Sequence, residues 1–355
     1  KIKLDYRSAE MRTKMDLGKL LVEMDKIDLK NQKVAIKNIT LDDTKAALAL
    51  AKPQTVKKAV VKTVKKLDTL VASPQTGKSW AVTLAKMTFT HDHIDFDNNA
   101  QKPISRGMDF GHLSIRDLNT ELEDLSYTAD NLSGKINSLT FNEKSGLQIR
   151  EFHTDFFYGP KNAYLKNLYL ETPTTVLQKE VQIGYPSLDA VTSNIGLLSV
   201  NANLDGSRLG LRDVLLLMPD MRTMEPFKSS PNTVFKINGR VSGRVNNLRI
   251  ANLDISGFGK THIKASATMR GLPNVEKAYF DLNIADFTTT RADIASLAPP
   301  GSIPPNISIP ENMNLKGTFK GSMKNFSTNM KLRSSLGAAD VNARFNGARK
   351  GHETY

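Results

Sequence analysis

The chain has 355 residues, of which 39% are hydrophobic and 24% are charged, so it can bury apolar surface along its whole length. Lys and Arg outnumber Asp and Glu by 49 to 36, a net charge of +13, which favours an anionic partner such as nucleic acid, anionic lipid or lipopolysaccharide, although a soluble protein with a basic surface fits as well. The absence of cysteine excludes disulfides, thiolate chemistry and cysteine-ligated zinc.

Neither end of the chain looks like a natural terminus. The sequence opens with KIKLDYRS, without a signal peptide, and none of its apolar runs reaches the ~18 residues of a membrane-spanning helix. We interpret the chain as an internal piece of a longer protein, whose membrane anchor would lie outside it.

Residues 1–50 introduce a pattern that recurs along the chain, apolar-x-apolar-x-x-apolar-x-apolar. Its first copy is Val22, Met24, Ile27 and Leu29. The later and looser copies predict one apolar face, lined by Val34, Ile36, Ile39, Leu41, Val82, Leu84, Met87, Phe89, Ile94, Phe96, Leu113, Ile115, Leu118, Ile136, Leu139, Phe141, Leu147, Ile149, Phe152, Leu165, Leu168, Leu170, Leu248, Ile250, Leu253 and Ile255.

The spacing within each copy predicts a bent β-strand. Alternation with period two indicates a strand with one buried face, and the doubled x would turn the second half of the strand over. A β-bulge at the doubled x restores the facing and bends the strand. Repetition therefore predicts an all-β fold, an elongated, curled antiparallel sheet that forms an apolar half-pipe. A two-sheet sandwich would use the same face, but the irregular recurrence of the pattern to beyond residue 250 favours the extended sheet.

Residues 51–78 predict the main helical insertion. Within TVKKAVVKTVKKLDTLV, valines and Leu67 form an apolar helical stripe. The lysines around it could contact an anionic membrane surface, although such a helix more often caps a sheet edge or the open end of a core; they are Lys57, Lys58, Lys62, Lys65 and Lys66.

Residues 79–230 return to the strand pattern and contain HDHIDFDNN, from His91 to Asn99. We interpret His91, Asp92 and His93 as a turn, after which Ile94 and Phe96 point inward. Asp95 and Asp97 then lie on the outer face, so the polar residues do not converge and a metal site is disfavoured. A short helix is predicted from Arg212 to Met218.

Residues 231–355 form a third strand-rich segment with two related glycine motifs. NGRVSGRVNNL from Asn238 resembles KGTFKGSMKNF from Lys316, and glycines within strands indicate bulges or close backbone approach. A short helix is predicted from Arg291 to Leu297. The proline-rich run from Pro299 to Pro310 is interpreted as a connection along a sheet edge.

Catalytic and cofactor motifs are not recognisable. HExxH, a nucleophile elbow, a P-loop and a dinucleotide fingerprint are all missing from the sequence. The stretch GFGKT from Gly257 resembles only the end of a P-loop. The aromatic residues occupy apolar repeat positions instead of standing among basic residues, which disfavours nucleic acid. We expect a protein that is not an enzyme and holds no cofactor or metal.

Several stretches, weak alone but in a specific order, resemble the AsmA-like superfamily and most closely the TamB-like translocation and assembly proteins of Bacteroidota. They are Trp80-Ala-Val-Thr-Leu, Ile94-Asp-Phe-Asp-Asn, Phe110-Gly-His-Leu-Ser-Ile-Arg-Asp-Leu-Asn, Phe152-His-Thr-Asp-Phe, Ala163-Tyr-Leu-Lys-Asn-Leu-Tyr-Leu-Glu-Thr-Pro, Leu204-Asp-Gly-Ser-Arg-Leu-Gly-Leu-Arg-Asp, Arg270-Gly-Leu-Pro-Asn and the two glycine motifs. The resemblance covers nearly the whole chain. It implies a periplasmic β-taco with an apolar interior, anchored in the inner membrane by an N-terminal helix that this chain lacks. It also implies an Omp85-type outer-membrane barrel as partner, through a C-terminal region that this chain also lacks.

Two functions are therefore expected. The first is a lipid conduit, in which the apolar face shields phospholipid acyl chains between the inner and outer membranes and supports outer-membrane biogenesis. The alternative is a chaperone or scaffold for outer-membrane proteins, whose strands would pair with an open edge of the sheet.

Overall fold

The computed structural model describes residues 2–50, 79–223, 227–297 and 308–347. Strands make up 64% of the described residues and helical elements 9%, which confirms an all-β fold built on a curled sheet. The chain divides into two compact units, Lys1–Pro173 with Leu216–Pro219, and Thr174–Leu215 with Asp220–Tyr355. The basic helix expected within residues 51–78, including Lys57 to Lys66, and nearly all of the proline-rich connection lie outside the described residues.

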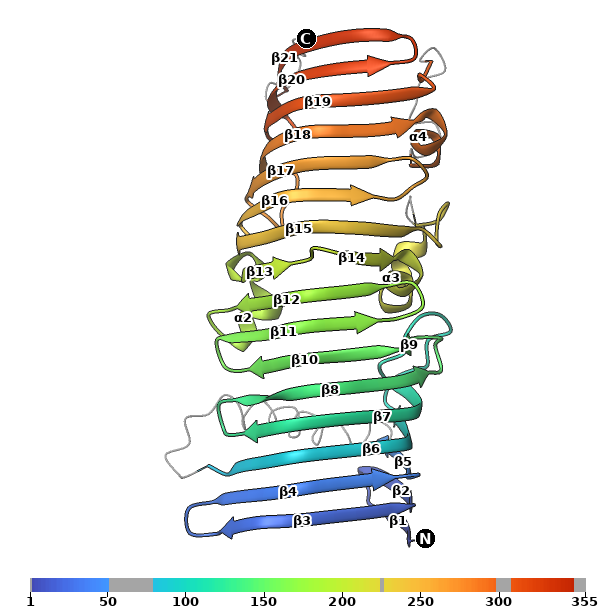
Figure 1. Cartoon of the computed structure of the whole chain (residues 1–355), viewed down its shortest axis with the longest axis vertical. Coiled ribbons are helices and arrows are strands. Elements are labelled where there is room, and N and C mark those ends of the chain that lie inside the picture. The colour runs from blue at the N-terminus through green and yellow to red at the C-terminus, as the bar shows by residue number, and fades with distance from the viewer. Residues whose placement is uncertain (1, 51–78, 224–226, 298–307, 348–355) are drawn as a thin grey trace. The chain divides into compact units, whose positions relative to one another are not determined.

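From residue 2 to residue 173, the described helices and strands of the first unit are all strands (Figure 1). Its described strands are β1 (Ile2–Arg7), β2 (Met11–Leu17), β3 (Lys19–Asp28), β4 (Lys33–Asp42), β5 (Lys45–Leu50), β6 (Ala81–Asn98), β7 (His112–Tyr127), β8 (Leu132–Glu143), β9 (Gln148–Ile149), β10 (Glu151–Tyr158) and β11 (Asn162–Glu171).

The sheet of the first unit is mixed rather than purely antiparallel. The first half of β6 pairs in parallel with β4, from Val34 opposite Val82 to Leu41 opposite Phe89. The second half of β6 pairs in parallel with β5. The long connection between β5 and β6 permits the crossover that parallel neighbours require, and the local repeat pattern did not reveal it.

The second unit adds short helices to the same kind of sheet. Its described elements are β12 (Val176–Gly184), α2 (Leu188–Ser193), a 3₁₀ turn (Ile195–Leu197), β13 (Ser199–Asn203), β14 (Ser207–Gly210), α3 (Leu211–Leu217), a second 3₁₀ turn (Pro219–Thr223), β15 (Val234–Arg244), β16 (Asn247–Ser256), β17 (His262–Arg270), β18 (Tyr279–Thr290), α4 (Arg291–Leu297), β19 (Asn312–Gly321), β20 (Asn325–Ser334) and β21 (Gly337–Asn346). The helices predicted near 212–218 and 291–297 are confirmed as α3 and α4.

Bulges bend the strands at the doubled x of the pattern. Between β16 and β17, Ile250 pairs with Ala267 and Leu253 pairs with Ala265, so two residues of β16 face one of β17. The second of the two, Asn252, has a positive φ of 52°. Asp and Asn tolerate this left-handed conformation better than other non-glycine residues. The bulge that the spacing predicts is therefore confirmed here, with a residue type suited to its backbone.

Asp or Asn with a positive φ also occurs at other bulges of the sheet. Asp117, Asp124 and Asn167 directly precede the apolar residues Leu118, Leu125 and Leu168 and have φ values of 52°, 53° and 50°. The two glycine motifs differ from these bulges. Gly239 and Gly317 have φ values of 153° and 148°, and the extra residue lies on the neighbouring strand, β16 or β18. A Cβ on Gly317 would collide with the carbonyl oxygen of Asn329 on β20, so the close approach predicted for the glycine motifs is confirmed at this position.

Inward-facing threonines satisfy backbone groups near the bulges. Thr120 on β7 donates from its hydroxyl to the carbonyl oxygen of Ser138 at 2.9 Å, and Thr154 on β10 donates to that of Lys166 at 2.9 Å. Both side chains are buried. Because a bulge disrupts the ladder locally, a threonine beside it keeps a backbone carbonyl paired without placing charge on the apolar face.

Candidate functional site

The apolar side chains of the first unit stand in rows that cross its strands. One row consists of Val22, Ile39, Met87, Leu122 and Ile136, each paired with the next on β3, β4, β6, β7 and β8. Directly opposite residues on neighbouring strands have Cβ atoms about 5 Å apart. The row is therefore a continuous apolar strip that runs perpendicular to the strands.

Several parallel rows repeat this arrangement. Met24, Ile36, Leu84 and Leu125 form a second row, and Leu20, Leu41, Phe89, Thr120 and Leu139 form a third. Two more join Leu4, Met15, Ala46, Ile94 and Ile115, and Tyr6, Thr13, Leu48, Phe96 and Leu113. The structure thus brings most of the predicted apolar residues of this unit onto one face.

The second unit carries the same kind of rows. Ile237, Ile255, Ile263, Phe287, Leu315 and Leu332 pair in succession from β15 to β20. A second row joins Val241, Ile250, Ala267, Leu282 and Phe319, and a third joins Leu253, Ala265, Ile284, Gly317 and Met330. Of the residues predicted here, Ile250, Leu253 and Ile255 belong to these rows, and Leu248 pairs with Met269 beside them.

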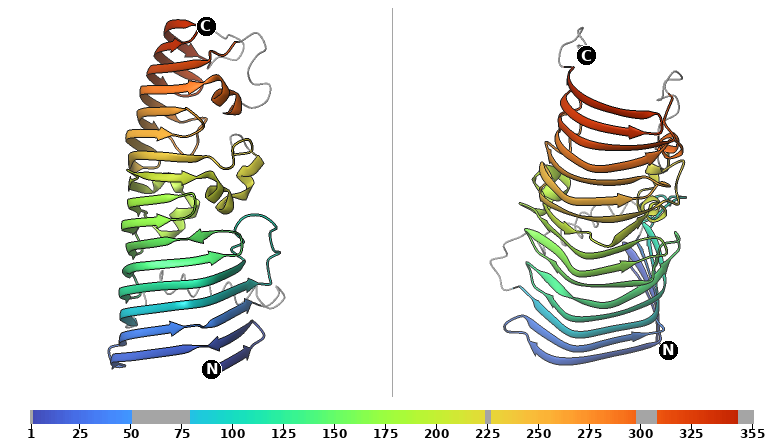
Figure 2. Two further views of the ribbon diagram at one scale, coloured as in Figure 1. Left: turned by 45° about the vertical axis from the view of Figure 1, so that its right-hand side comes forward. Right: turned by 45° about the horizontal axis from the view of Figure 1, so that its top comes forward.

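The apolar rows lie on the concave side of each sheet. Figure 2 shows that the strands curve, so each sheet has a concave and a convex side. Along β20, Phe326, Met330 and Leu332 are half-buried, whereas the smaller Ser327 and Asn329 between them are exposed. In a single curved layer, side chains converge on the concave side and diverge on the convex side, which accounts for this alternation. In the first unit the same crowding leaves Leu84 only 4% exposed.

A few predicted residues lie away from the centre of the rows. Phe141 pairs with Ile149 at the ends of β8 and β9, and Leu147 lies in the turn between these strands. Phe152 pairs with Leu170 on β11. Leu165 pairs with Phe156, which the pattern did not single out. Leu118 and Leu168, next to their bulges, are buried.

The stretch HDHIDFDNN does not contain the predicted turn. β6 runs unbroken through it, and His91 forms a bulge with a φ of 53°. The bulge places Asp92 on the apolar face, where it pairs with Leu118 and is 1% exposed. Ile94 pairs with Ile115 on that face, as expected for an inward residue. The prediction of a turn was wrong because an αL residue lets a strand continue where its pattern breaks.

The convex face of the first unit is polar, and several of its charged side chains are paired. Arg116 contacts Asp95 at 2.9 Å, Lys86 contacts Glu121 at 2.6 Å, and Lys135 contacts Asp124 at 2.9 Å. Each pair joins two neighbouring strands. Exposed pairs of this kind contribute little stability, about 0–1 kcal/mol each, but they give the convex face a hydrated, charged surface that contrasts with the apolar rows.

The loop of GFGKT is filled by a carboxylate of the protein itself. The backbone N–H of Lys260 and the hydroxyl of Thr261 both donate to Oδ2 of Asp293 at 3.0 Å. A Cβ on Gly259 would collide with the same carboxylate. The loop therefore holds α4, and the donors that a phosphate would need are already engaged.

The described part of the chain offers little support for a site of another kind. Within it, His, Cys, Asp and Glu do not gather in groups of three or more that could hold a metal ion. None of its described helices is long and apolar enough to cross a membrane. No protein-family model, curated protein or solved structure matches the chain.

Proposed function

We propose that the concave apolar face binds lipid and shields acyl chains from water. The observation that carries this proposal is the register of the rows, which continue from strand to strand across the sheet of each unit. A contiguous exposed apolar surface of this kind is typical of a binding surface. Burial of an acyl chain contributes about 0.8 kcal/mol per CH₂ group. The burial of a long acyl chain therefore supplies ample free energy for binding.

The rows suit movement of a lipid as well as its binding. Apolar contact is non-directional, and successive rows offer similar surfaces, so no single position would retain the lipid. The polar convex face remains in water. These properties support a conduit in which acyl chains travel along the concave face.

We further propose that the chain is a TamB-like member of the AsmA-like superfamily. In that role it would lie in the periplasm, anchored to the inner membrane through a region outside this chain. It would carry phospholipid in support of outer-membrane biogenesis, together with an Omp85-type barrel, and would have no catalytic activity. The curled sheet, its bulged strands and its apolar concave face support this assignment.

The proposal is tested by matched pairs of lysine substitutions on opposite faces. Met87→Lys with Ile136→Lys places two charges on either side of Leu122 in one apolar row, whereas Thr88→Lys with Ser138→Lys places two on either side of Glu121 on the convex face. Mass spectrometry of lipids that co-purify with each folded variant is the measurement.

We expect several-fold less bound acyl lipid for the inner pair and an unchanged amount for the outer pair, because a charge is costly beside an acyl chain. Equal lipid content in both pairs, with both proteins folded, would contradict the proposal.

A β-strand scaffold is the second candidate, and the edge of the first unit favours it. β3 pairs with β4 on one side, and its other edge is unpaired among the described residues. Leu20, Val22 and Met24 on this strand are exposed. An extended client strand could pair there by β-augmentation. The scaffold would be favoured over the conduit if Glu23→Pro abolished the assembly of outer-membrane proteins in cells while the inner lysine pair retained it.

A further inference from the structure

Among the described residues, positive charge is concentrated in the second unit. Its described residues include 20 Lys and Arg against 12 Asp and Glu, whereas those of the first unit include 19 against 21. Of the surface that the structure describes, the second unit is therefore the part that would attract an anionic partner.

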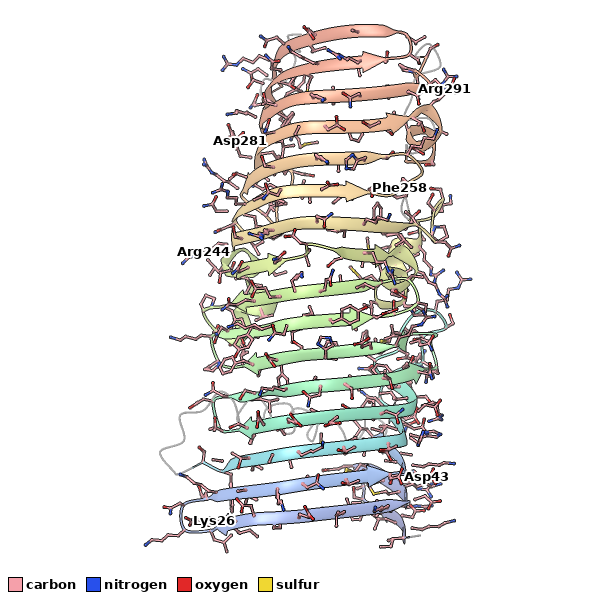
Figure 3. The ribbon with its side chains drawn as sticks, viewed as in Figure 1. Lys26, Asp43, Arg244, Phe258, Asp281 and Arg291 are labelled. Carbon is pink, nitrogen blue, oxygen red and sulfur yellow. The ribbon has the colours of Figure 1, made fainter. Side chains whose placement is uncertain are left out.

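Four arginines of this unit form a cluster on the convex face. Arg240 and Arg244 lie on β15, Arg249 on β16 and Arg270 on β17, and all four are exposed. They alternate with the apolar row residues Val241, Ile250 and Met269, which places them on the opposite face of the sheet. Figure 3 shows Arg244 at one margin of the sheet, with Phe258 and Arg291 at the other.

The register brings these arginines close together. Arg249 pairs with Ser242, which lies between Arg240 and Arg244 along β15. It also pairs with Thr268, two residues before Arg270. Diagonal neighbours of this kind lie about 7–8 Å apart at Cα. From the strand rise and spacing, the cluster extends roughly 13 Å along the strands and roughly 10 Å across them.

The charge of the cluster is nearly uncompensated. In the described part of the chain, its ion pairs are limited to Arg240 with Asp205, at 3.6 Å. The carboxylate on the convex face of these three strands is already paired with other residues. Asp254 contacts His262 at 2.7 Å and Lys264 at 3.5 Å, and the hydrogen bond from His262 lowers the pKa of the Asp254 carboxyl.

A polar depression of about 460 Å³ adjoins the cluster on β16, β17 and β18. Arg249 belongs to both. Hydroxyl and amide side chains line the depression, namely Asn252, Ser266, Thr268 and Asn283. Asp281 lies at its border, 3.5 Å from Lys320. These groups can donate hydrogen bonds to the hydroxyls of a ligand and accept hydrogen bonds from them.

We propose that the arginine cluster and this depression bind the phosphate and hydroxyl groups of anionic lipid headgroups at a membrane surface. Arginine suits this role because its planar guanidinium forms paired hydrogen bonds with phosphate oxygens. The dimensions of the cluster accommodate more than one phosphate, as a membrane surface presents. The site lies on the face opposite the apolar rows, so it would hold the second unit against a membrane while the concave face stays free for acyl chains.

The test is co-sedimentation of the whole chain with vesicles of phosphatidylcholine, alone or with 30% phosphatidylglycerol or 30% phosphatidylserine. Arg244→Gln with Arg270→Gln is compared with Lys331→Gln with Arg333→Gln, which removes the same charge from the convex face of β20. We expect binding to phosphatidylglycerol vesicles that the arginine pair weakens by about tenfold or more and the control pair by less than about threefold, with affinity falling as salt rises.

At equal surface charge, phosphatidylglycerol is expected to bind more tightly than phosphatidylserine, because its glycerol hydroxyls fit the depression. The proposed headgroup site would be contradicted if the two variant pairs weakened vesicle binding equally, or if the protein bound all three kinds of vesicle equally. Binding of soluble glycerol phosphate or of a single-stranded oligonucleotide through the same arginines, without vesicle binding, would overturn the membrane assignment. Because acyl-chain capture is measured with other residues on the other face, failure here leaves the proposed function standing.

Discussion

The backbone N–H of Thr44 donates to Oδ1 of Asp92 at 2.8 Å, and both residues are 1% exposed. Thr44 lies between the end of β4 at Asp42 and the start of β5 at Lys45. The bond is therefore opposite the bulge of β6 at His91. In the described part of the chain, Oδ2 of Asp92 has no hydrogen-bond partner. Burial is the main cause that raises the pKa of the Asp92 carboxyl, and repulsion from Asp42 and Asp43 adds to it.

This carboxyl makes stability depend on pH in a specific direction. The folded-state pKa lies above the unfolded value, so folding takes up a proton. The contribution of Asp92 is therefore most favourable in acid and is lost as pH rises from the unfolded pKa through the folded pKa. We expect Asp92→Asn to raise the melting temperature at pH 7 and to flatten its dependence on pH above about 4.

The measurement is thermal unfolding of both proteins across pH 4 to 8. Asp97→Asn, an exposed residue of the same strand, is the control and should leave the profile unchanged. A lower melting temperature for Asp92→Asn at pH 7 would contradict the prediction, because it would show that the ionised carboxylate stabilises the fold at the bulge of β6.

The bulge at Asp117 predicts opposite effects of two substitutions. A β-branched residue is strained at a φ of 52°, whereas glycine is not. We expect Asp117→Val to lower the free energy of unfolding by about 1–2 kcal/mol and Asp117→Gly to change it by less than half of that. Chemical denaturation of both variants measures the difference, and equal losses would argue against backbone strain as the cause.

The carboxylate of Asp293 is expected to hold α4 in place. Asp293→Ala leaves the N–H of Lys260 without its acceptor, whereas the hydroxyl of Thr261 still has that of Thr289 at 2.8 Å. A hydrogen bond to a charged group contributes about 1.5–3 kcal/mol, so stability should fall by about 2–3 kcal/mol. Hydrogen exchange should accelerate in residues 257–262 and 291–297.

The α3 segment serves as a control region within the Asp293→Ala variant. Asp213 of α3 accepts hydrogen bonds from the hydroxyls of Thr174 and Thr175, both at 2.6 Å, and its segment should keep its exchange rates. Unchanged exchange at residues 257–262 in Asp293→Ala would show that packing alone positions the helix.

The sequence predicted those parts of the fold that depend on local chemistry. Alternation defined the strands and their apolar face, and the doubled x located bulges such as that at Asn252. Leu211–Leu217 and Arg291–Leu297 were recognisable because proline follows each of them.

The missed features depend on contacts between distant residues. The parallel pairing of β6 with β4 and β5 leaves no trace in the alternation of β6 itself. His91 looked like a turn residue because its αL conformation interrupts the period, although the strand continues. Asp92 belongs to the predicted turn, and only the bulge at His91 places its side chain on the apolar face. The arginine cluster is spread over three strands, so it becomes visible only when their register is known.

Acyl-chain binding on the concave face is tested most directly by photo-crosslinking at two adjacent residues of β11. Leu165 pairs with the inward Phe156, whereas the amine of Lys166 lies 4.6 Å from the ring of Tyr164 on the convex face. A photoreactive amino acid at each position, followed by irradiation in cells and mass spectrometry of the adduct, reports what each side chain touches. We predict a phospholipid adduct from position 165 and none from position 166. A lipid adduct from position 166 but not from position 165 would contradict the account.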